Sequence, residues 1–414
     1  MKEKLISSRI NNALWVIVTL LPLIIIPIKG IPDIFNVAKA PVLVLGTLFI
    51  GYHLIQLKEI HLEQEAKPLI IYLALSLFAS IMAYKPLLAL SGASMTAGRF
   101  EGFISIFFYA ILFYAAKHHM RLNFKNILFF IVVQSIIAAY AIMQFFMLDP
   151  LVEYLNYTRG SYATIGNQNF LASWALMLLV IASGFYLKFR KYRYLIFPAL
   201  FFGALLASNT RGCWLALMVI SLASLYFLRF SNLRASYFKL LASFLIVFFT
   251  MNFFSESKIQ HRTKTIKSEL DINNEWAGSG RALIWKMSFD IVEAHPFLGA
   301  GPENLKEALK QTKNKRAIEY GVLTGHTVDK AHNDFLHIAA VSGAPALLFY
   351  IFFIFSLLFK QRKNIFTCSV QSTIALTVFA YLIQSLFNIS VIAVAPLFWV
   401  LLGLLANKNQ QVST

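Results

Sequence analysis

The sequence predicts an all-α protein that crosses a membrane many times. Hydrophobic residues make up 58% of the 414 positions and charged residues 14%, and the mean hydropathy is +0.66. A soluble domain of this length would be far less apolar. The apolar residues also form continuous runs of about twenty, the length that an α-helix needs to cross a bilayer. Strands of a membrane barrel would alternate apolar and polar residues in shorter segments, so we expect helices.

The chain contains about twelve such runs, each long enough to be a candidate span. Their approximate centres are Leu20, Leu45, Leu75, Phe108, Val132, Leu178, Phe201, Val219, Ile246, Phe349, Thr377 and Trp399. The sequence contains no fixed-period repeat, low-complexity linker or glycine-rich nucleotide-binding motif. We therefore expect residues 1–414 to form a single polytopic membrane domain.

Basic residues cluster in every second connection between the predicted spans, and the positive-inside rule assigns those connections to the cytoplasm. Both termini are then cytoplasmic, and the polar segment 255–330, between the ninth and tenth spans, is a large outer loop. The first apolar run is long and lacks a small-residue cleavage site, so we expect no cleaved signal peptide. The basic clusters are Lys2, Lys4 and Arg9; Lys58 and Lys67; Lys117, Arg121 and Lys125; Lys188, Arg190, Lys191 and Arg193; Arg229, Arg234 and Lys239; and Lys360, Arg362 and Lys363.

Several cations depart from this distribution because they fall in outer connections. The formal net charge is +18, and most of it belongs to the cytoplasmic loops, where membrane insertion and anionic lipids account for it. We therefore expect membrane lipids, and not nucleic acid, as the general partner of that surface. Arg99, Arg159, Arg211 and Arg281 lie on the other side. An anionic ligand at the outer face would explain them.

Three short stretches carry most of the site information. Ser208 to Trp214 form a tight outer turn that holds Arg211 at the membrane surface. Gly278-Ser279-Gly280 opens an amphipathic helix with Arg281 in its first turn, where free backbone N–H groups and the helix dipole favour an anion. We expect this helix to lie on the membrane or on the helix bundle and to end near His295-Pro296. His332-Asn333, followed after nine residues by Gly343, marks the point where hydrophobicity resumes.

Each stretch also has a purely structural interpretation. Arg211 could cap backbone carbonyls or extend its charged end to the membrane surface. Arg281 could pair with a loop carboxylate such as Glu275 or Asp290. His332 could be an ordinary interfacial histidine. The two cysteines, Cys213 and Cys368, lie in or beside different apolar segments and predict no structural disulfide.

The order of these motifs resembles the O-antigen ligase family, which includes O-antigen polymerases and protein-glycosylating ligases. The resemblance rests on Thr-Arg-Gly at 210–212, Ser-Gly-Arg at 279–281 and His332-Asn333 with Gly343. Gly-Asn-Gln-Asn-Phe at 166–170 and Gly-Arg-Phe-Glu-Gly at 98–102 extend it. Where the family has a second glycine, this chain has Ala346, which we interpret as a variation in packing.

The resemblance implies transfer of a glycan from an undecaprenyl-pyrophosphate carrier to a hydroxyl acceptor, lipid A-core, at the periplasmic face of the inner (cytoplasmic) membrane. By analogy, Arg211 and Arg281 bind the pyrophosphate, with Arg99 and Arg159 as further candidates. His332 would be the general base, and direct attack by the acceptor would invert the anomeric centre. Asn333 and Gly343 would have supporting roles.

We expect no cofactor and no metal, because arginines can supply the positive charge that a divalent ion supplies elsewhere. His332 and His337 are five residues apart and would point in different directions on a helix. Three enzyme readings remain open: a ligase, a polymerase whose acceptor is a second lipid-linked glycan, and a protein O-oligosaccharyltransferase. A lipid-linked oligosaccharide flippase is the non-enzyme alternative, although the predicted span interiors carry few charges.

Overall fold

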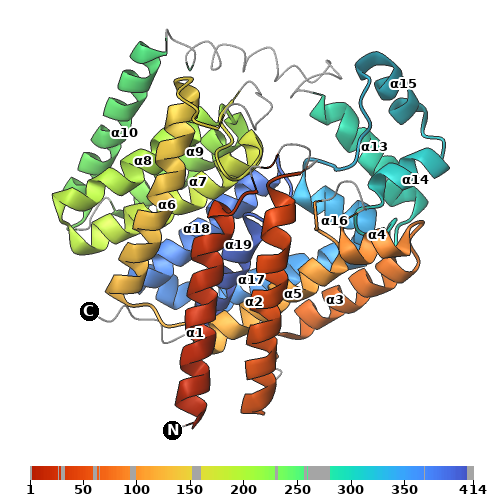
Figure 1. The fold of residues 1–414 in the computed structure, drawn as a ribbon, viewed down its shortest axis with the longest axis horizontal. Helices are drawn as coiled ribbons and strands as arrows, with labels where there is room; N and C mark the ends of the chain where they lie inside the picture. The colour runs from red at the N-terminus through yellow and green to blue at the C-terminus, as the bar shows by residue number, and fades with distance from the viewer. Residues whose placement is uncertain are drawn as a thin grey trace.

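The computed structural model describes residues 2–26, 28, 33–58, 63–64, 66–93, 99–151, 160–228, 232–255, 259, 280–367 and 369–407, and within these ranges it consists of helices and loops without β-strands (Figure 1). The predicted all-α class is confirmed. The helices are α1 (Lys2–Leu20), η1 (Leu21–Leu23), α2 (Asn36–Leu57), α3 (Ala66–Ile81), α4 (Pro86–Ser91), α5 (Phe103–His119), α6 (Phe124–Phe145), α7 (Gln168–Phe189), η2 (Tyr192–Leu195), α8 (Ile196–Ala207), α9 (Arg211–Leu228), α10 (Arg234–Phe254), α13 (Arg281–Ala294), α14 (Leu305–Gln311), α15 (Lys315–Thr324), α16 (Asp334–Ser342), α17 (Ala344–Thr367), α18 (Ser369–Ser385) and α19 (Ala395–Ala406).

Six helical segments of the described chain are long and apolar enough to cross a membrane. They are Lys2–Leu23, Asn36–Leu57, Phe124–Phe145, Gln168–Phe189, Arg234–Phe254 and Ala344–Ile365, and four shorter apolar helices accompany them. Every predicted span centre falls inside a helix, while the count of twelve spans stays a prediction. Large apolar side chains such as Leu45, Ile55 and Ile246, each at least 66% exposed, cover the outer faces of these helices, as expected of a surface that contacts lipid.

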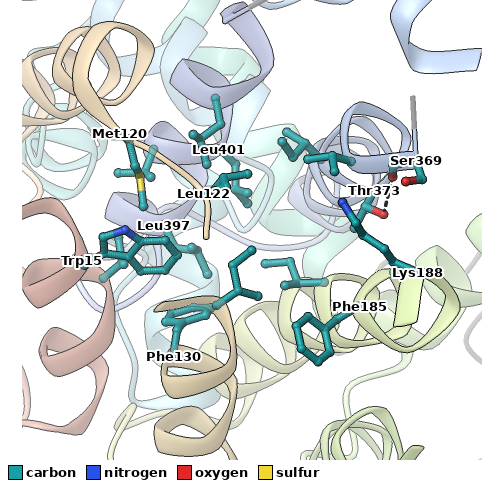
Figure 2. A pocket seen from close by; sticks show the side chains of 18 of the residues that line it. Trp15, Met120, Leu122, Phe130, Phe185, Lys188, Ser369, Thr373, Leu397 and Leu401 are labelled. Atoms are coloured by element: carbon teal, nitrogen blue, oxygen red, sulfur yellow. Dashed lines mark hydrogen bonds between the residues drawn. The ribbon is translucent and has the colours of Figure 1, made fainter. Parts of the chain in front are cut away.

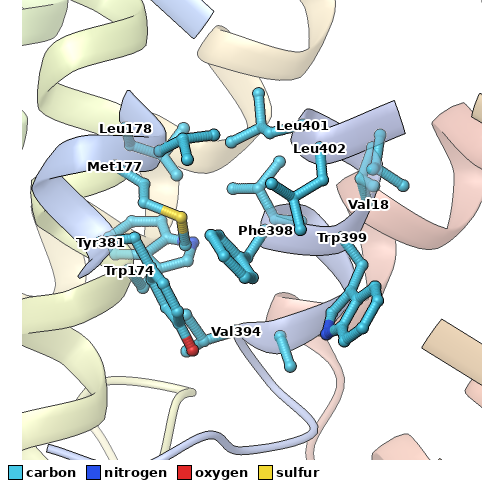
Figure 3. Packing of buried hydrophobic residues seen from close by; sticks show 14 of the residues in the cluster. Val18, Trp174, Met177, Leu178, Tyr381, Val394, Phe398, Trp399, Leu401 and Leu402 are labelled. Carbon is cyan, nitrogen blue, oxygen red and sulfur yellow. The ribbon is translucent and has the colours of Figure 1, made fainter. Parts of the chain in front are cut away.

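The core of the bundle is built around α19. All twelve residues of this helix are buried, so it is apolar on every side, as a helix at the centre of a bundle must be. Figure 3 shows Phe398 of α19 beside Trp174 and Met177 of α7 and Tyr381 of α18, while Trp399 points to the opposite side. Phe398 stacks on Tyr381 with ring centroids 4.1 Å apart, and α19 also packs extensively against α5.

The two predicted sets of loops lie at opposite ends of the helices. At one end, Glu63 contacts Lys117 at 2.8 Å and Lys360 at 3.7 Å, so three predicted cytoplasmic segments meet. At the other end, Lys85 contacts Glu307 at 2.7 Å and Arg99 contacts Asp329 at 2.8 Å. Helix α5 runs from the second end to the first. This separation agrees with the predicted alternation of the connecting loops between the two sides of the membrane. Which end faces the cytoplasm stays a prediction.

The described part of the predicted outer loop forms a small helical layer, α13 to α15, at the upper right of Figure 1. Helix α13 ends at Ala294, with His295 as its C-cap, as predicted. Its buried residues pack on α14 and α16 in one apolar cluster that includes Met287, Leu305 and Leu336. The amphipathic helix therefore lies on the bundle. Residues 256–258 and 260–279 of the predicted loop lie outside the described residues.

Candidate functional site

The structure brings most of the predicted site residues to helix beginnings at one end of the bundle. Arg211 is the first residue of α9 and Arg281 the first residue of α13. His332 and Asn333 directly precede α16, and Arg99 precedes α5. The remaining predicted arginine, Arg159, lies outside the described residues, as do Gly278 and Ser279.

Arg281 is close enough to both the His332 loop and the start of α9 for its charge to act on each. Its charge acts on His332, together with that of Arg99, and it also acts on Cys213, two residues after Arg211. Gly280, with φ 79°, turns the chain into α13 and provides no side-chain cap for the helix. The backbone N–H groups of the first turn are thus left to other acceptors, which is the condition under which a helix beginning attracts an anion.

The Arg211 turn is held by a second predicted motif. Asn209 has φ 55°, which reverses the chain within a few residues. The Thr210 hydroxyl is 3.3 Å from both the Gln168 carbonyl and the Asn169 side-chain oxygen. A Cβ on Gly212 would approach Phe387 to 2.9 Å. The Thr-Arg-Gly turn and the Asn-Gln-Asn segment are therefore one packed unit, although 42 residues separate them in sequence.

The loop that carries His332 is anchored by contacts of the residues just before and just after this histidine. Asp329 pairs with Arg99 at 2.8 Å, and Lys330 forms an ion pair with Glu303 in which the side chains are 3% and 10% exposed. His332 itself has φ 49°, and Asn333 caps α16 by accepting a hydrogen bond from the Leu336 backbone N–H at 3.1 Å. Asn333 thus fixes the beginning of α16 directly after His332, and its supporting role in the reaction stays a prediction.

Gly343 joins α16 to α17 with φ 90° and ψ 158°, a conformation that is essentially confined to glycine. A Cβ there would lie 2.0 Å from the Phe297 carbonyl oxygen. The Ala344 N–H donates to the Pro296 carbonyl at 2.9 Å, and Ala346 is fully buried. The absence of a side chain at Gly343 thus allows the α13–α14 connection to pack closely against the bundle.

Asp290, which the sequence suggested as a partner of Arg281, is bound by two other side chains. Arg316 donates to both carboxylate oxygens of Asp290 at 2.7 Å, and Asn314 donates to the same group at 2.7 Å. Glu275, the other proposed partner, lies outside the described residues.

A buried polar cluster next to His332 was not assigned a role from the sequence. Lys330 also contacts Nε2 of His337 at 3.2 Å. Glu101 accepts from the Tyr109 hydroxyl at 2.6 Å and from the Ser390 hydroxyl at 3.0 Å, and the Ser390 N–H donates to Asp334 at 3.2 Å. These groups line a cavity of about 60 Å³, enough for a few waters. A charged residue just before an apolar run, as at Glu101 and Lys330, is the signal that could have identified them.

Burial raises the pKa of Glu101 to about 8, although hydrogen bonds from Tyr109 and Ser390 and the charge of Lys330 oppose this. The pKa of His332 moves the other way. Burial, reinforced by the charges of Arg281 and Arg99, lowers it from 6.5 to about 4. His332 is therefore neutral near pH 7. Its Nδ1 is buried without a hydrogen-bond partner among the described residues. A neutral imidazole beside two arginines can accept a proton from a group held next to an anion.

Residues 196–351 match the family model described as O-antigen ligase. The match supports an assignment to the O-antigen ligase family over this segment. No curated protein matches the chain. The matched O-antigen ligase segment runs from α8 into α17 and contains Arg211, Arg281, His332, Asn333 and Gly343. Arg99, which contacts the His332 loop from the segment before α5, precedes the matched segment.

The match to the O-antigen ligase family model supports a membrane enzyme of the glycosyltransferase type. It implies a lipid-linked glycan and an acceptor as substrates in general. The six apolar helices long enough to cross a membrane agree with a multi-pass membrane protein. The predicted resemblance and the coarse function are thus supported by independent observations.

Proposed function

We propose that this protein transfers a glycan from an undecaprenyl-pyrophosphate carrier to a hydroxyl of lipid A-core. The reaction takes place at the periplasmic face of the inner membrane. The observation that carries the proposal is the position of Arg281 at the beginning of α13, where its charge acts both on His332, just before α16, and on Cys213, two residues after Arg211 at the beginning of α9. The pyrophosphate of a lipid-linked donor would lie at this end of the bundle, at the membrane surface. His332, the proposed base for the acceptor hydroxyl, lies at the same end.

Arg211 and Arg281 bind the pyrophosphate of the donor, and Arg99 and Arg159 extend the positive surface. Arginine suits this role because its planar group binds phosphate oxygens with two parallel, charge-assisted hydrogen bonds. Negative charge accumulates on the pyrophosphate as the bond between sugar and phosphate breaks. Fixed cations aimed at that charge lower the barrier, and in this proposal they act without a metal ion.

His332 removes the proton of the acceptor hydroxyl as that oxygen attacks the anomeric carbon. The carbon–oxygen bond to the acceptor forms while the bond to the pyrophosphate breaks, so the configuration inverts. The low pKa of His332 keeps the imidazole neutral and ready to accept a proton. Arrival of the anionic pyrophosphate next to Arg281 and Arg99 offsets their charge, which raises the basicity of His332 when the donor is bound.

The deciding experiment is product analysis after reconstitution. Purified protein in vesicles receives an undecaprenyl-pyrophosphate glycan together with lipid A-core and a peptide, in the presence of chelator. We expect glycan on lipid A-core. Glycan that grows on the carrier lipid instead would identify a polymerase, and glycan on the peptide a protein ligase. Movement of the carrier glycan across the bilayer without any transfer would favour the flippase.

The same assay tests His332 through His332→Asn, because asparagine tolerates the positive φ at this position better than alanine does. Loss of general-base catalysis should slow transfer about 10²–10⁴-fold. The matched control is His326→Asn in the same loop, where the side chain is exposed, and it should keep its rate. Full activity of His332→Asn would remove His332 from the mechanism.

A further inference from the structure

A second cavity lies at the end of the bundle opposite to His332. It is lined by residues of α1, α6, α7, α18 and α19 and of the loop between α5 and α6, and its volume is about 100 Å³. In Figure 2, Trp15 and Phe130 lie beside each other at one side of it, near Met120 and Leu397, and Phe185 and Lys188 lie toward the other side. The lining is almost wholly apolar. A cavity of this size and composition stays dry and accepts hydrocarbon.

One edge of the cavity is cationic. Lys188, in the last turn of α7, is the only charged residue among the lining residues, and Figure 2 shows its side chain beside Thr373. Arg190 is exposed two positions after Lys188. A ligand that fills the cavity and ends at this edge would therefore combine an apolar chain with a negative headgroup.

We propose that this cavity binds a segment of one acyl chain of an anionic phospholipid, with its phosphate headgroup against Lys188. The cations belong to loops that carry the positive-inside bias, and the leaflet next to such loops holds anionic lipid that basic pockets between helices bind. The charge complementarity favours this occupant over an uncharged lipid, and the apolar lining favours it over a soluble anion. The site is independent of the glycan-transfer chemistry at the other end of the bundle.

Trp15, which lines the cavity, provides a local probe. Purified protein in an uncharged detergent is titrated with phosphatidylglycerol whose acyl chains are brominated, or with phosphatidylcholine carrying the same chains. Bromine quenches tryptophan fluorescence on contact, and the part of the quenching that disappears in Trp15→Phe reports Trp15 among the six tryptophans. We expect half-maximal Trp15 quenching at a several-fold lower fraction of phosphatidylglycerol than of phosphatidylcholine.

Two variants separate the cavity from general contact with lipid. Lys188→Gln should move the phosphatidylglycerol curve toward the phosphatidylcholine curve, whereas Lys67→Gln should not, because Lys67 is an exposed lysine on α3, which does not line the cavity. Val400→Phe should fill the cavity and abolish the Trp15 signal, with Ile181→Phe as a replacement if the first variant does not fold.

Equal curves for the two lipids, or quenching that survives both filling variants, would overturn the proposal by assigning the signal to the general lipid belt. Relief of quenching by undecaprenyl phosphate at a lower fraction than by unbrominated phosphatidylglycerol would also overturn it, because the carrier lipid would then be the occupant.

Discussion

Among single residues, His332 shows how position sets chemistry. Its backbone is left-handed, its Nδ1 is buried, and the charges of Arg281 and Arg99 reach it from two other elements. Each feature alone is compatible with a structural histidine. Their combination gives a neutral imidazole within the field of cations that suit an anionic donor.

The positive charge around His332 predicts that kcat and kcat/KM begin to fall at different pH values when the medium is acidified. In the free protein, burial and the arginines lower the pKa of His332 to about 4. Bound pyrophosphate offsets the arginine charges, which favours the protonated ring and raises the pKa. Since kcat/KM reports the free protein and kcat the donor complex, kcat should begin to fall at a higher pH than kcat/KM as the medium is acidified. Transfer rates from pH 4 to 8, at limiting and saturating donor, test this.

Acid also acts on stability, so the pH series needs a control. The pKa of His332 is lower in the folded protein than its ordinary value of 6.5. The unfolded chain therefore binds more protons between about pH 6.5 and 4, and stability is lost as the pH falls through this window. Samples returned to neutral pH must regain full activity. Coincident acidic limits in reversible samples would refute the coupling between donor and base.

The buried ion pair between Lys330 and Glu303 predicts a contrast between a single and a double variant. Lys330→Met leaves Glu303 buried without its partner, which should cost about 3–5 kcal/mol of folding free energy, whereas Lys330→Met with Glu303→Leu should be close to neutral. Thermal denaturation in detergent measures both. If the pair also positions the His332 loop, the stable double variant should keep its donor KM and lose kcat. A double variant with normal kcat would limit the pair to a structural role.

At the scale of elements, the glycines of the Gly299-Ala300-Gly301 segment permit close approach to the bundle. A Cβ on Gly299 would lie 2.4 Å from the Val341 backbone, and one on Gly301 would lie 2.3 Å from the Ala83 side chain. The Ala300 and Gly301 N–H groups donate to carbonyls of α16 at 2.9 and 2.8 Å. These contacts join the α13–α14 connection to the helix that follows His332.

Gly343 gives the test of this junction. Gly343→Ala forces a Cβ into the Phe297 carbonyl and a conformation that alanine avoids, so we expect a loss of well over 2 kcal/mol or failure to fold. The control is Gly325→Ala, also at positive φ but with nothing within 4 Å of the added Cβ. It should cost about 1 kcal/mol. Equal unfolding temperatures for the two variants would show that the contact with Phe297 is dispensable.

For the whole molecule, the decisive feature is the division into two polar ends joined by apolar helices. Lys117 and Lys360 meet Glu63 at one end, and Arg99 and His332 occupy the other. The proposed reaction needs the second end to face outward, where lipid-linked glycans would be presented to the acceptor.

Cysteine labelling tests that orientation. Single cysteines replace Lys363 or Glu319, both exposed, in a chain without Cys213 and Cys368. A membrane-impermeant maleimide added to spheroplasts should label position 319, and position 363 should react only after the membrane is opened. The reverse pattern would invert the topology and exclude a periplasmic site at His332.

The sequence by itself determined the helical class, the positions of the apolar helices and the separation of two sets of loops, because bilayer thickness and backbone hydrogen bonding leave few alternatives for such runs. It also proposed Arg211, Arg281 and His332 as candidate site residues, and their roles stay predictions. Only the tertiary structure decided which of these residues are close enough to interact electrostatically, as Arg281 and Arg99 do with His332. It also decided that Lys330, Glu303, Glu101 and Ser390 form a buried cluster beside His332. Those contacts join segments up to 289 residues apart, and the packing that pairs distant segments is not encoded in local periodicity.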